Sequence, residues 1–225
     1  MWMDDLRSIY LDSLGLDVLT ERRDRPRREG STDGDRAAAL EDLHTSLVDC
    51  HRCPLGDTRT NLVFGTGDPH ARLVFVGEAP GRDEDLKGEP FVGKAGQLLT
   101  KIIAAMGLTR KDVYICNVNK CRPPGNRDPH PSEVEACQPF LLRQLEIISP
   151  KVICALGGFA AKALLDSDAR ISQVRGTFHT YNGIPLMPTY HPSFLLRNPN
   201  AKREVWDDMK KIMEYLDLPI PNGRA

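Results

Sequence analysis

The sequence predicts an α/β fold, a three-layer α/β/α sandwich around a mainly parallel four-stranded sheet. Apolar runs at 73–76, 113–118 and 151–156 have the length and β-branched content of strands that are buried on both faces. Each run is followed by a turn or loop and then by apolar residues spaced three and four apart, which is typical of a helix packed on a sheet. Right-handed crossovers between such units give parallel strands with helices on both sides.

The first strand ends at Gly77, and a tight turn is expected after it because Pro80 and Gly81 follow closely. In open α/β sheets, ligands bind at the carboxyl ends of the strands. Glu78 is therefore expected at that edge of the sheet. The next helix is expected to start near Gly93 and to pack one apolar stripe on the sheet, formed by Leu98, Leu99, Ile102, Ile103 and Met106.

The second strand runs into 119–129, a loop in which three prolines exclude regular structure. A helix is expected from Pro131, and the third strand is followed by a helix at 159–165. The segments 176–181 and 184–189 flank Asn182-Gly183, which predicts a two-residue hairpin turn. A final amphipathic helix is expected from about 201 to 215.

Three parts are expected along the chain. Residues 1–35 read as a flexible N-terminal extension, because a charged stretch and a Gly- and Ser-containing linker end it. Residues 36–217 form the folded domain, which opens with a helix at 36–48 capped by Asp35, and 218–225 form a C-terminal tail. An apolar stripe ahead of the linker suggests that the extension docks on a partner protein; its members are Leu6, Ile9, Tyr10 and Leu14.

The overall charge gives no hint of a polyanionic partner. The 225 residues include 30 basic and 31 acidic side chains, a net charge of −1, so any contact with DNA must come from a local patch. The sequence lacks an apolar run long enough to span a membrane and a basic leader followed by an apolar core. We therefore expect an unexported, cytoplasmic protein that is a monomer and does not contact membranes.

The six cysteines are more consistent with metal ligands or buried thiols than with disulfides. Cys50 and Cys53, with two residues between them, indicate a metal half-site or a redox pair, and the redox pair is less favoured because they follow a helix and precede Pro54. Cys121 is the best further ligand, since it lies in an irregular loop between two cations, and Cys137 follows in the first turns of the next helix. Four thiolates can hold zinc or a [4Fe-4S] cluster, and the chemistry of the ligands does not choose between them. The other two cysteines fall inside apolar strands.

Two segments carry a resemblance to a known family. Gly77-Glu78-Ala79-Pro80-Gly81 with Pro90-Phe91-Val92-Gly93-Lys94-Ala95-Gly96, and His191-Pro192-Ser193-Phe194-Leu195-Leu196-Arg197, resemble the two motifs of the family 4, iron-sulfur uracil-DNA glycosylases. The resemblance covers about residues 45 to 200 and includes the cysteine spacing and Lys120-Cys121-Arg122-Pro123-Pro124. It implies a [4Fe-4S] cluster held by Cys50, Cys53, Cys121 and Cys137. Taken alone, the first segment also fits an ordinary turn in another α/β enzyme.

The resemblance also implies roles for individual residues. Glu78 matches a principal catalytic residue, His191 lies against uracil O2, and Asn126 matches an asparagine near the catalytic water. Asn117 reads the edge of the base and Phe91 stacks on it, while Ala79 stands where many members have glycine and narrows the pocket slightly. These roles suit the reaction, because an anionic departing base needs a donor and an oxocarbenium-like sugar needs a carboxylate or an oriented water.

DNA contacts are expected near the same loops. The resemblance places Ser193, Leu195 and Arg197 in a loop that enters the minor groove, where Leu195 or Leu196 would fill the hole left by the flipped base. Further cations are expected around the site, namely Lys94, Lys120, Arg122, Arg127 and Arg175.

The function implied is base excision repair. A monofunctional glycosylase would flip uracil out of single- or double-stranded DNA and hydrolyse its N-glycosidic bond, leaving an abasic site. One alternative is a non-catalytic iron-sulfur or zinc DNA-binding module, in which Glu78 and His191 would not matter. Another is an unrelated nucleotide hydrolase, which is disfavoured because the sequence has no P-loop and no acidic metal cluster.

Overall fold

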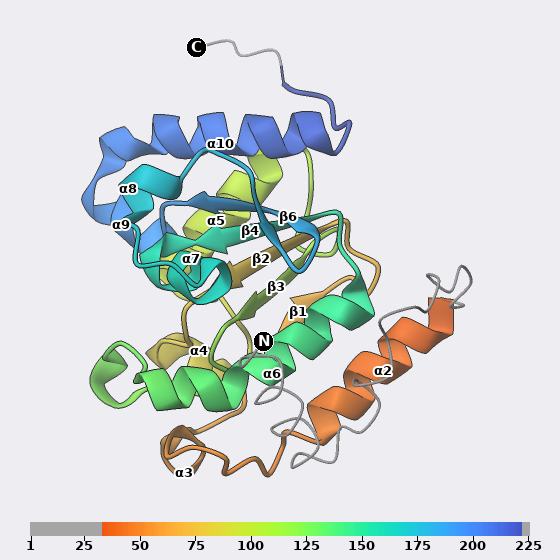
Figure 1. Ribbon diagram of the computed structural model, residues 1–225, viewed down its shortest axis with the longest axis vertical. Coiled ribbons are helices and arrows are strands. Elements are labelled where there is room, and N and C mark those ends of the chain that lie inside the picture. Colours follow the sequence, from red (N-terminus) through yellow and green to blue (C-terminus); the bar gives the residue numbers. More distant parts are fainter. Residues whose placement is uncertain (1–32, 222–225) are drawn as a thin grey trace, which may run out of the picture. The chain divides into compact units, whose positions relative to one another are not determined.

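A computed structural model describes residues 33–221. The predicted extension at 1–32, with its apolar stripe, and residues 222–225 lie outside the described residues. Within 33–221, helices cover both faces of a central β-sheet, which gives the α/β fold that the sequence predicts (Figure 1).

The sheet has six strands rather than the four predicted, in the order β1-β3-β2-β4-β6-β5. Its four central strands are parallel, and the short edge strands β1 and β5 pair antiparallel to their neighbours. The edge strands carry no buried apolar run, so the pattern that marks central strands is missing from them. The strands are β1 Thr66–Gly67, β2 Leu73–Gly77, β3 Tyr114–Asn117, β4 Val152–Leu156, β5 His179–Tyr181 and β6 Ile184–Thr189.

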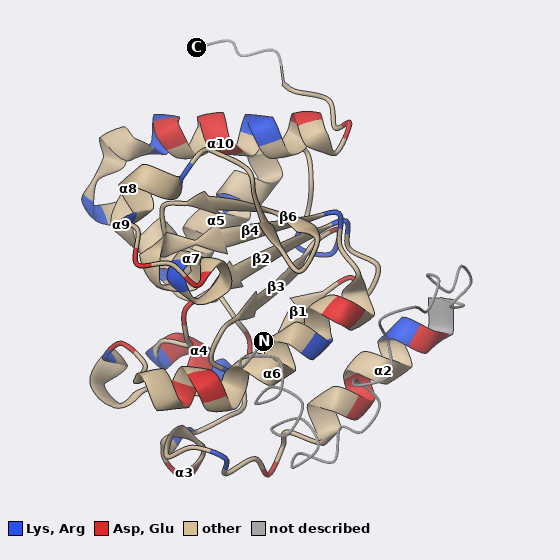
Figure 2. Ribbon diagram, viewed as in Figure 1, with Lys and Arg blue, Asp and Glu red and all other residues tan. Residues whose placement is uncertain are grey.

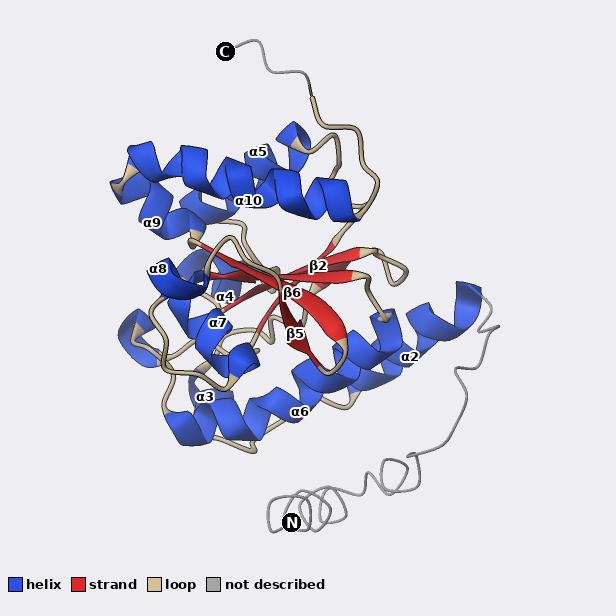
Figure 3. Ribbon diagram, turned by 45° about the horizontal axis from the view of Figure 1, so that its top comes forward, coloured by secondary structure: helices blue, strands red, loops and turns tan. Residues whose placement is uncertain are grey.

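Two hydrophobic layers sandwich the sheet (Figure 3). One face packs on α5 Lys94–Ala105, α9 Pro192–Arg197 and α10 Lys202–Tyr215. The other packs on α2 Asp33–Thr45, α6 Pro131–Ile148, α7 Gly157–Leu165 and α8 Ile171–Val174. Within β2, Val74 and Val76 point to the second layer while Leu73 and Phe75 point to the first. This alternation follows from the two-residue period of a strand.

Short helices complete the connections and lie near the loops of interest. They are α3 Leu55–Thr58, α4 Arg82–Lys87 and the 3-10 turns η2 Pro124–Asn126 and η3 Pro199–Ala201. Gly81 and Gly88 bound α4, a short helix in the charged stretch between the turn after β2 and Phe91.

Most predicted boundaries are confirmed within one or two residues. The predicted hairpin turn is present, with Asn182 and Gly183 at φ 47° and 80°. The predicted N-cap Asp35 is wrong, because α2 already begins at Asp33 and Asp35 lies inside it. That helix ends at Thr45, and irregular turns lead from there to Cys50.

Charges of both signs are spread over the helices, and acidic and basic residues alternate along α10 (Figure 2). This distribution agrees with the near-zero net charge of the sequence. None of the helices in 33–221 is long and apolar enough to cross a membrane.

Candidate active site

A cavity of about 390 Å³ opens at the carboxyl edge of the four parallel strands. The loops that follow β2, β3 and β6 contribute to its wall, together with the start of α7. Among the residues that line it are Glu78, Ala79, Phe91, Asn117, Asn126, Arg127, His191, Ser193 and Arg197. Side chains that are more than a hundred residues apart in the sequence therefore share one pocket.

Phe91 forms an aromatic wall of this pocket and is 7% exposed. Its backbone is left-handed, with φ 54°, and Arg110 donates to its carbonyl oxygen at 3.1 Å. The Glu84 carboxylate holds the following backbone by accepting from the N–H groups of Val92 and Gly93, each at 3.0 Å. Sequence reasoning missed Glu84, since its partners lie eight and nine residues away in an irregular loop.

Gly77 makes room for two side chains of the pocket at the end of β2. A Cβ atom there would lie 2.4 Å from the Asn117 Oδ1 atom and 2.5 Å from the Phe91 ring. Contacts that short do not occur, so a larger residue would push the amide or the ring out of place. Glycine at this position is therefore a condition for the pocket.

Asn117 ends β3 and is 2% exposed. Its backbone oxygen accepts from Lys120 Nζ at 2.6 Å, but among the described residues its side-chain Oδ1 has no hydrogen-bond partner. Buried polar atoms are nearly always paired, so an unpaired oxygen at a pocket wall points to a ligand that pairs with it. The amide can accept with its oxygen and donate with its nitrogen.

Glu78 lies at the turn after β2, as predicted. Burial raises the pKa of its carboxyl group to about 7, and the charge of Asp128 adds to the rise. A carboxyl group with this pKa exchanges a proton near neutral pH, as acid or base catalysis requires.

His191 caps the N-terminus of α9. Its Nδ1 atom accepts from the Ser193 backbone N–H at 3.1 Å and lies 2.7 Å from Ser193 Oγ. Burial lowers the pKa of the imidazole to about 4, although the charge of Glu84 opposes this. The ring is thus neutral at pH 7 and carries its proton on Nε2, because Nδ1 is the acceptor. The His191 side chain lies close to the backbone of Gly157. A Cβ atom at Gly157 would lie 2.9 Å from His191 Cβ, so this position requires glycine.

The loop after β3 brings Asn126 and Arg127 to the pocket. Asn126 has a left-handed backbone, with φ 55°, and its Oδ1 atom accepts from Arg122 Nε at 2.7 Å. Arg127 makes two hydrogen bonds to the Glu133 carboxylate, at 2.7 and 2.8 Å. Arg122 is consequently the freer of the two cations for a contact with DNA.

Consecutive leucines of α9 have opposite environments. Leu195 is 1% exposed and belongs to the layer formed with α5 and α10, whereas Leu196 is 46% exposed. In this conformation, Leu195 is out of reach of DNA, and a wedge must be Leu196. The sequence could not decide between the two leucines, because both lie in the motif. Consecutive residues of a helix point to different faces, and only the structure shows which face is exposed.

Two predicted DNA-binding cations are engaged inside the protein. Lys120 is 1% exposed and donates to the Gln144 Oε1 atom as well as to Asn117. Arg175 pairs with Asp208 and Glu204 of α10. The prediction that these two cations contact DNA is therefore wrong for this structure. Lys94, in contrast, is exposed at the start of α5.

The four predicted ligand cysteines lie before α3, in the loop after β3 and in α6. Burial raises the pKa of the Cys121 and Cys137 thiols, to about 12 for Cys137, and neighbouring thiols add to both increases: Cys53 and Cys50 for Cys121, Cys121 and Cys53 for Cys137. Such mutual effects require the thiols to be near one another. As the side chains of residues 33–221 stand, however, no group of three has the spacing of a bound metal.

Hydrogen-bond donors face three of these sulfurs, although burial raises the pKa of their thiols overall. Lys120 N–H donates to Cys137 Sγ and Arg59 donates to Cys121 Sγ, both at 3.3 Å, while backbone N–H groups of Leu55 and Gly56 face Cys53. Hydrogen bonds to sulfur favour its charged form. Cys116 and Cys154 are instead fully buried in the central strands. The donor set therefore fits a four-thiolate centre at the predicted residues.

Comparison with known proteins agrees with this geometry. The family model for the Uracil DNA glycosylase superfamily matches residues 64–210 of the chain. A type-4 uracil-DNA glycosylase of Archaeoglobus fulgidus is 49% identical over 191 residues, which cover 81% of this chain and 96% of the relative. One from Thermotoga maritima is 46% identical over 185 residues, covering 80% and 96%. The chain belongs to the Uracil DNA glycosylase superfamily and, by these identities, to its type-4 branch.

Proposed function

We propose that this protein is a monofunctional uracil-DNA glycosylase that flips uracil out of DNA and leaves an abasic site for base excision repair. The observation that carries the proposal is the unpaired Asn117 oxygen, buried in a pocket that also holds Phe91 and His191. Similarity to type-4 uracil-DNA glycosylases supports the same activity.

Asn117 would select the base. Its Oδ1 atom accepts from the uracil N3–H group, and its amide nitrogen donates to O4. Cytosine has an unprotonated N3 and an amino group at C4, so both pairings would become mismatched, and a buried mismatch is costly. Phe91 takes the extruded base by its face.

His191 would stabilise the departing base. When the bond between N1 and C1′ breaks, the electron pair stays on the base, and negative charge develops on O2. A neutral His191 donates its Nε2–H to that oxygen without adding a buried charge to the resting site.

Glu78 and Asn126 would act on the sugar side. Ionised Glu78 stabilises the oxocarbenium-like sugar and accepts a proton from the water that attacks C1′, while Asn126 orients that water. The products are the abasic sugar with a new hydroxyl group and uracil, which regains a proton from solvent. Among the described residues that line the pocket there is no lysine that could form a Schiff base, which supports hydrolysis without strand cleavage.

DNA would be held by the loop that contains α9 and by the loop after β3. Arg197 and Ser193 line the pocket, and exposed Leu196 fills the gap left by uracil. Arg122 contributes a phosphate contact, and Arg127 contributes less because Glu133 already holds it.

We also propose that Cys50, Cys53, Cys121 and Cys137 hold a [4Fe-4S] cluster. When bound, the cluster cross-links the segment after α2 to the loop after β3 and to α6, and it has a structural role because hydrolysis needs no electrons. Stoichiometric iron and acid-labile sulfide in the anaerobically purified protein are expected. One equivalent of zinc with no colour would refute the cluster while leaving the glycosylase intact.

The remaining proposals concern organisation. Residues 36–217 form the glycosylase domain and 218–225 form a tail. The segment 1–35 is an extension that binds a protein partner. The enzyme acts as a monomer in the cytoplasm, on the DNA of the nucleoid. Deletion of 1–30 is expected to leave uracil excision unchanged and to abolish co-purification of that partner.

The central experiment incubates the protein with uracil-containing single- and double-stranded oligonucleotides and then with alkali. Cleavage at the former uracil is expected after alkali and not before it. Glu78→Gln and His191→Ala should each reduce excision by at least about 10²-fold, by analogy with loss of one preorganised donor. Tight DNA binding without alkali-sensitive sites would identify a non-catalytic binding module instead.

A further inference from the structure

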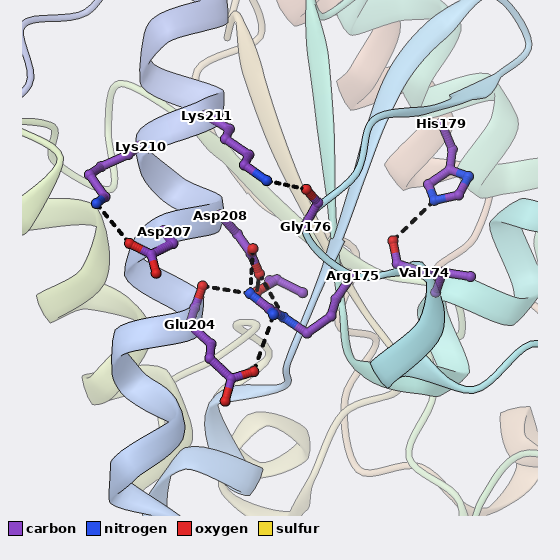
Figure 4. Close-up of polar contacts among 10 residues, drawn as sticks. Val174, Arg175, Gly176, His179, Glu204, Asp207, Asp208, Lys210 and Lys211 are labelled. Atoms are coloured by element: carbon purple, nitrogen blue, oxygen red, sulfur yellow. Dashed lines mark hydrogen bonds and ion pairs between the residues drawn. The ribbon is translucent and has the colours of Figure 1, made fainter.

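A charged cluster centred on the buried Asp208 holds the backbone next to His191. It consists of Arg175, Thr189, Glu204 and Asp208, and we call it the Arg175–Asp208 cluster. Figure 4 labels Arg175, Glu204 and Asp208. Thr189 is the last residue of β6 and is fully buried, and Asp208 on α10 is 1% exposed. None of the four residues lines the pocket, so the reaction described above does not use them directly.

Both carboxylate oxygens of Asp208 are bound. The Thr189 hydroxyl group donates to Oδ2 at 2.6 Å, and Arg175 Nε donates to the same oxygen at 3.1 Å. A second guanidinium nitrogen pairs with Oδ1 and also donates to the Glu204 backbone oxygen at 2.6 Å. Charge-assisted hydrogen bonds of this kind fix geometry more tightly than neutral ones.

The cluster extends to the residues that flank His191. The Arg175 guanidinium lies over the ring of Tyr190, 5.2 Å from its centroid. Tyr190 in turn packs against Phe194 of α9, with ring centroids 4.7 Å apart. The two residues before His191 and the helix after it are thus connected to one buried carboxylate.

The backbone around Asp208 is shaped to accommodate the carboxylate. Gly176 has a left-handed backbone, with φ 72°, and a Cβ atom there would lie 2.8 Å from Asp208 Oδ1. Lys211 donates to the Gly176 oxygen at 2.6 Å and fixes this approach. An apolar pair would fill the same space at less cost in desolvation, so stability alone is a weak reason for a charged pair here.

We infer that Asp208 is a positioning residue for His191: through Thr189 and Arg175 it fixes the junction of β6 and α9, so that His191 Nε2 points at O2 of the departing base. This inference rests on the proposed function and adds the group that orients its donor. A displacement of about 1 Å at a catalytic group can cost on the order of 10²-fold in rate.

Thr189→Val and Thr189→Ser test this link with little change in shape. Valine keeps the volume and removes the hydroxyl group, whereas serine keeps the hydroxyl group. We expect Thr189→Val and Asp208→Asn to lower the single-turnover excision rate by about 10-fold or more, while DNA affinity is unchanged. Thr189→Ser should retain most of the rate.

Asp207→Asn is the matched control, since Asp207 is the neighbouring residue on α10, is half exposed and pairs with Lys210 at 2.7 Å (Figure 4). It should leave the rate unchanged. Rates are measured well below each variant's unfolding temperature, so that loss of fold does not count. A rate equal to wild type in Thr189→Val and Asp208→Asn, whatever their stability, would overturn the inference.

Nitrogen-15 NMR of the His191 ring supplies a readout that needs no activity. The Nδ1 and Nε2 shifts should move in Thr189→Val and Asp208→Asn and stay in place in Asp207→Asn. If wild type released no uracil, the proposed function would fail, yet these shifts would still report whether the cluster orients the ring. Unmoved shifts would refute the positioning role.

Discussion

Strands β3 and β6 are the outer members of the four parallel strands, and each leads to one side chain that we propose recognises the base. Asn117 ends β3 and His191 follows β6, and a buried charged residue holds each strand end. On the β3 side that residue is Lys120, and on the β6 side it is Asp208.

The two supports differ in how their charge is balanced. Asp208 has the guanidinium of Arg175 beside it, whereas Lys120 donates to two neutral oxygens, Asn117 O and Gln144 Oε1, at 2.6 and 2.5 Å. A buried charge without an opposite charge is expensive. Burial raises the pKa of the Cys137 thiol to about 12, although the charge of Lys120 opposes this, so the nearby cysteines would supply a negative charge only as thiolates bound to a metal. The β3 side should therefore depend on the cysteine centre, and the β6 side should not.

The largest expected effect comes from Cys121→Ala, which removes one proposed ligand. We expect loss of bound metal together with a large fall in thermal stability, because apo metal sites of this kind often do not fold. Metal analysis and thermal unfolding measure both. The control Cys154→Ala, in a central strand, should retain its metal; metal retained in Cys121→Ala would remove Cys121 from the ligand set.

Lys120→Met should have the next largest effect, because it removes the buried cation while keeping an unbranched chain. Faster metal release to a chelator is expected, with a fall of about 10-fold in excision efficiency as Asn117 loses its support. Lys151→Met, at an exposed position before β4, is the control. If Lys120→Met released its metal at the wild-type rate, the proposal that Lys120 connects the cysteine centre to Asn117 would be refuted.

The pH dependence of stability separates Glu78 from His191. The pKa of Glu78 rises on folding from 4.5 to about 7, so the folded state holds the extra proton and stability falls as pH rises through this window. The pKa of His191 falls from 6.5 to about 4, so the unfolded state holds more protons and stability grows with pH over that range.

Denaturant unfolding at pH 4 to 7 checks these opposite signs. Relative to wild type, Glu78→Gln should become more stable as pH rises, and His191→Asn should become less stable. Excision should increase as pH rises through about 7, if ionised Glu78 is the active form. Parallel curves for wild type and both variants would mean that neither pKa is shifted.

The smallest effects distinguish the two leucines of α9. Leu195→Ala should cost about 2 to 5 kcal/mol in unfolding free energy because it leaves a cavity in the core. Leu196→Ala should change stability by less than about 0.5 kcal/mol but reduce excision from double-stranded DNA several-fold. Single-stranded DNA leaves no gap to fill, so its excision serves as the control. Equal losses on both substrates would argue against a wedge.

The fold was largely readable from the sequence because central strands and long helices carry strong periodic signals. The runs at 73–76 and 151–156 and the helix from Pro131 are where they were predicted. The edge strand β1 was not predicted, since two residues carry no such signal, and β5, predicted at 176–181 from its hairpin turn, begins only at His179.

The site divides in the same way. Glu78, Asn117 and His191 could be named because each stands directly after a strand, within a recognisable motif. Lys120 and Arg175 look like DNA-binding cations in the sequence, yet both are internal. A basic residue reads the same in a sequence whether it faces solvent or a buried oxygen.

The sequence by itself determined the order of strands and helices, the motif residues at the strand ends and the cysteine spacing, because local periodicity and turn chemistry encode them. Only the tertiary structure decided that Asn117 Oδ1 is left unpaired beside Phe91, that Leu196 rather than Leu195 faces outward, and that Asp208 supports the strand leading to His191. These contacts join residues far apart in the chain, and their partners are chosen by packing that no local pattern records.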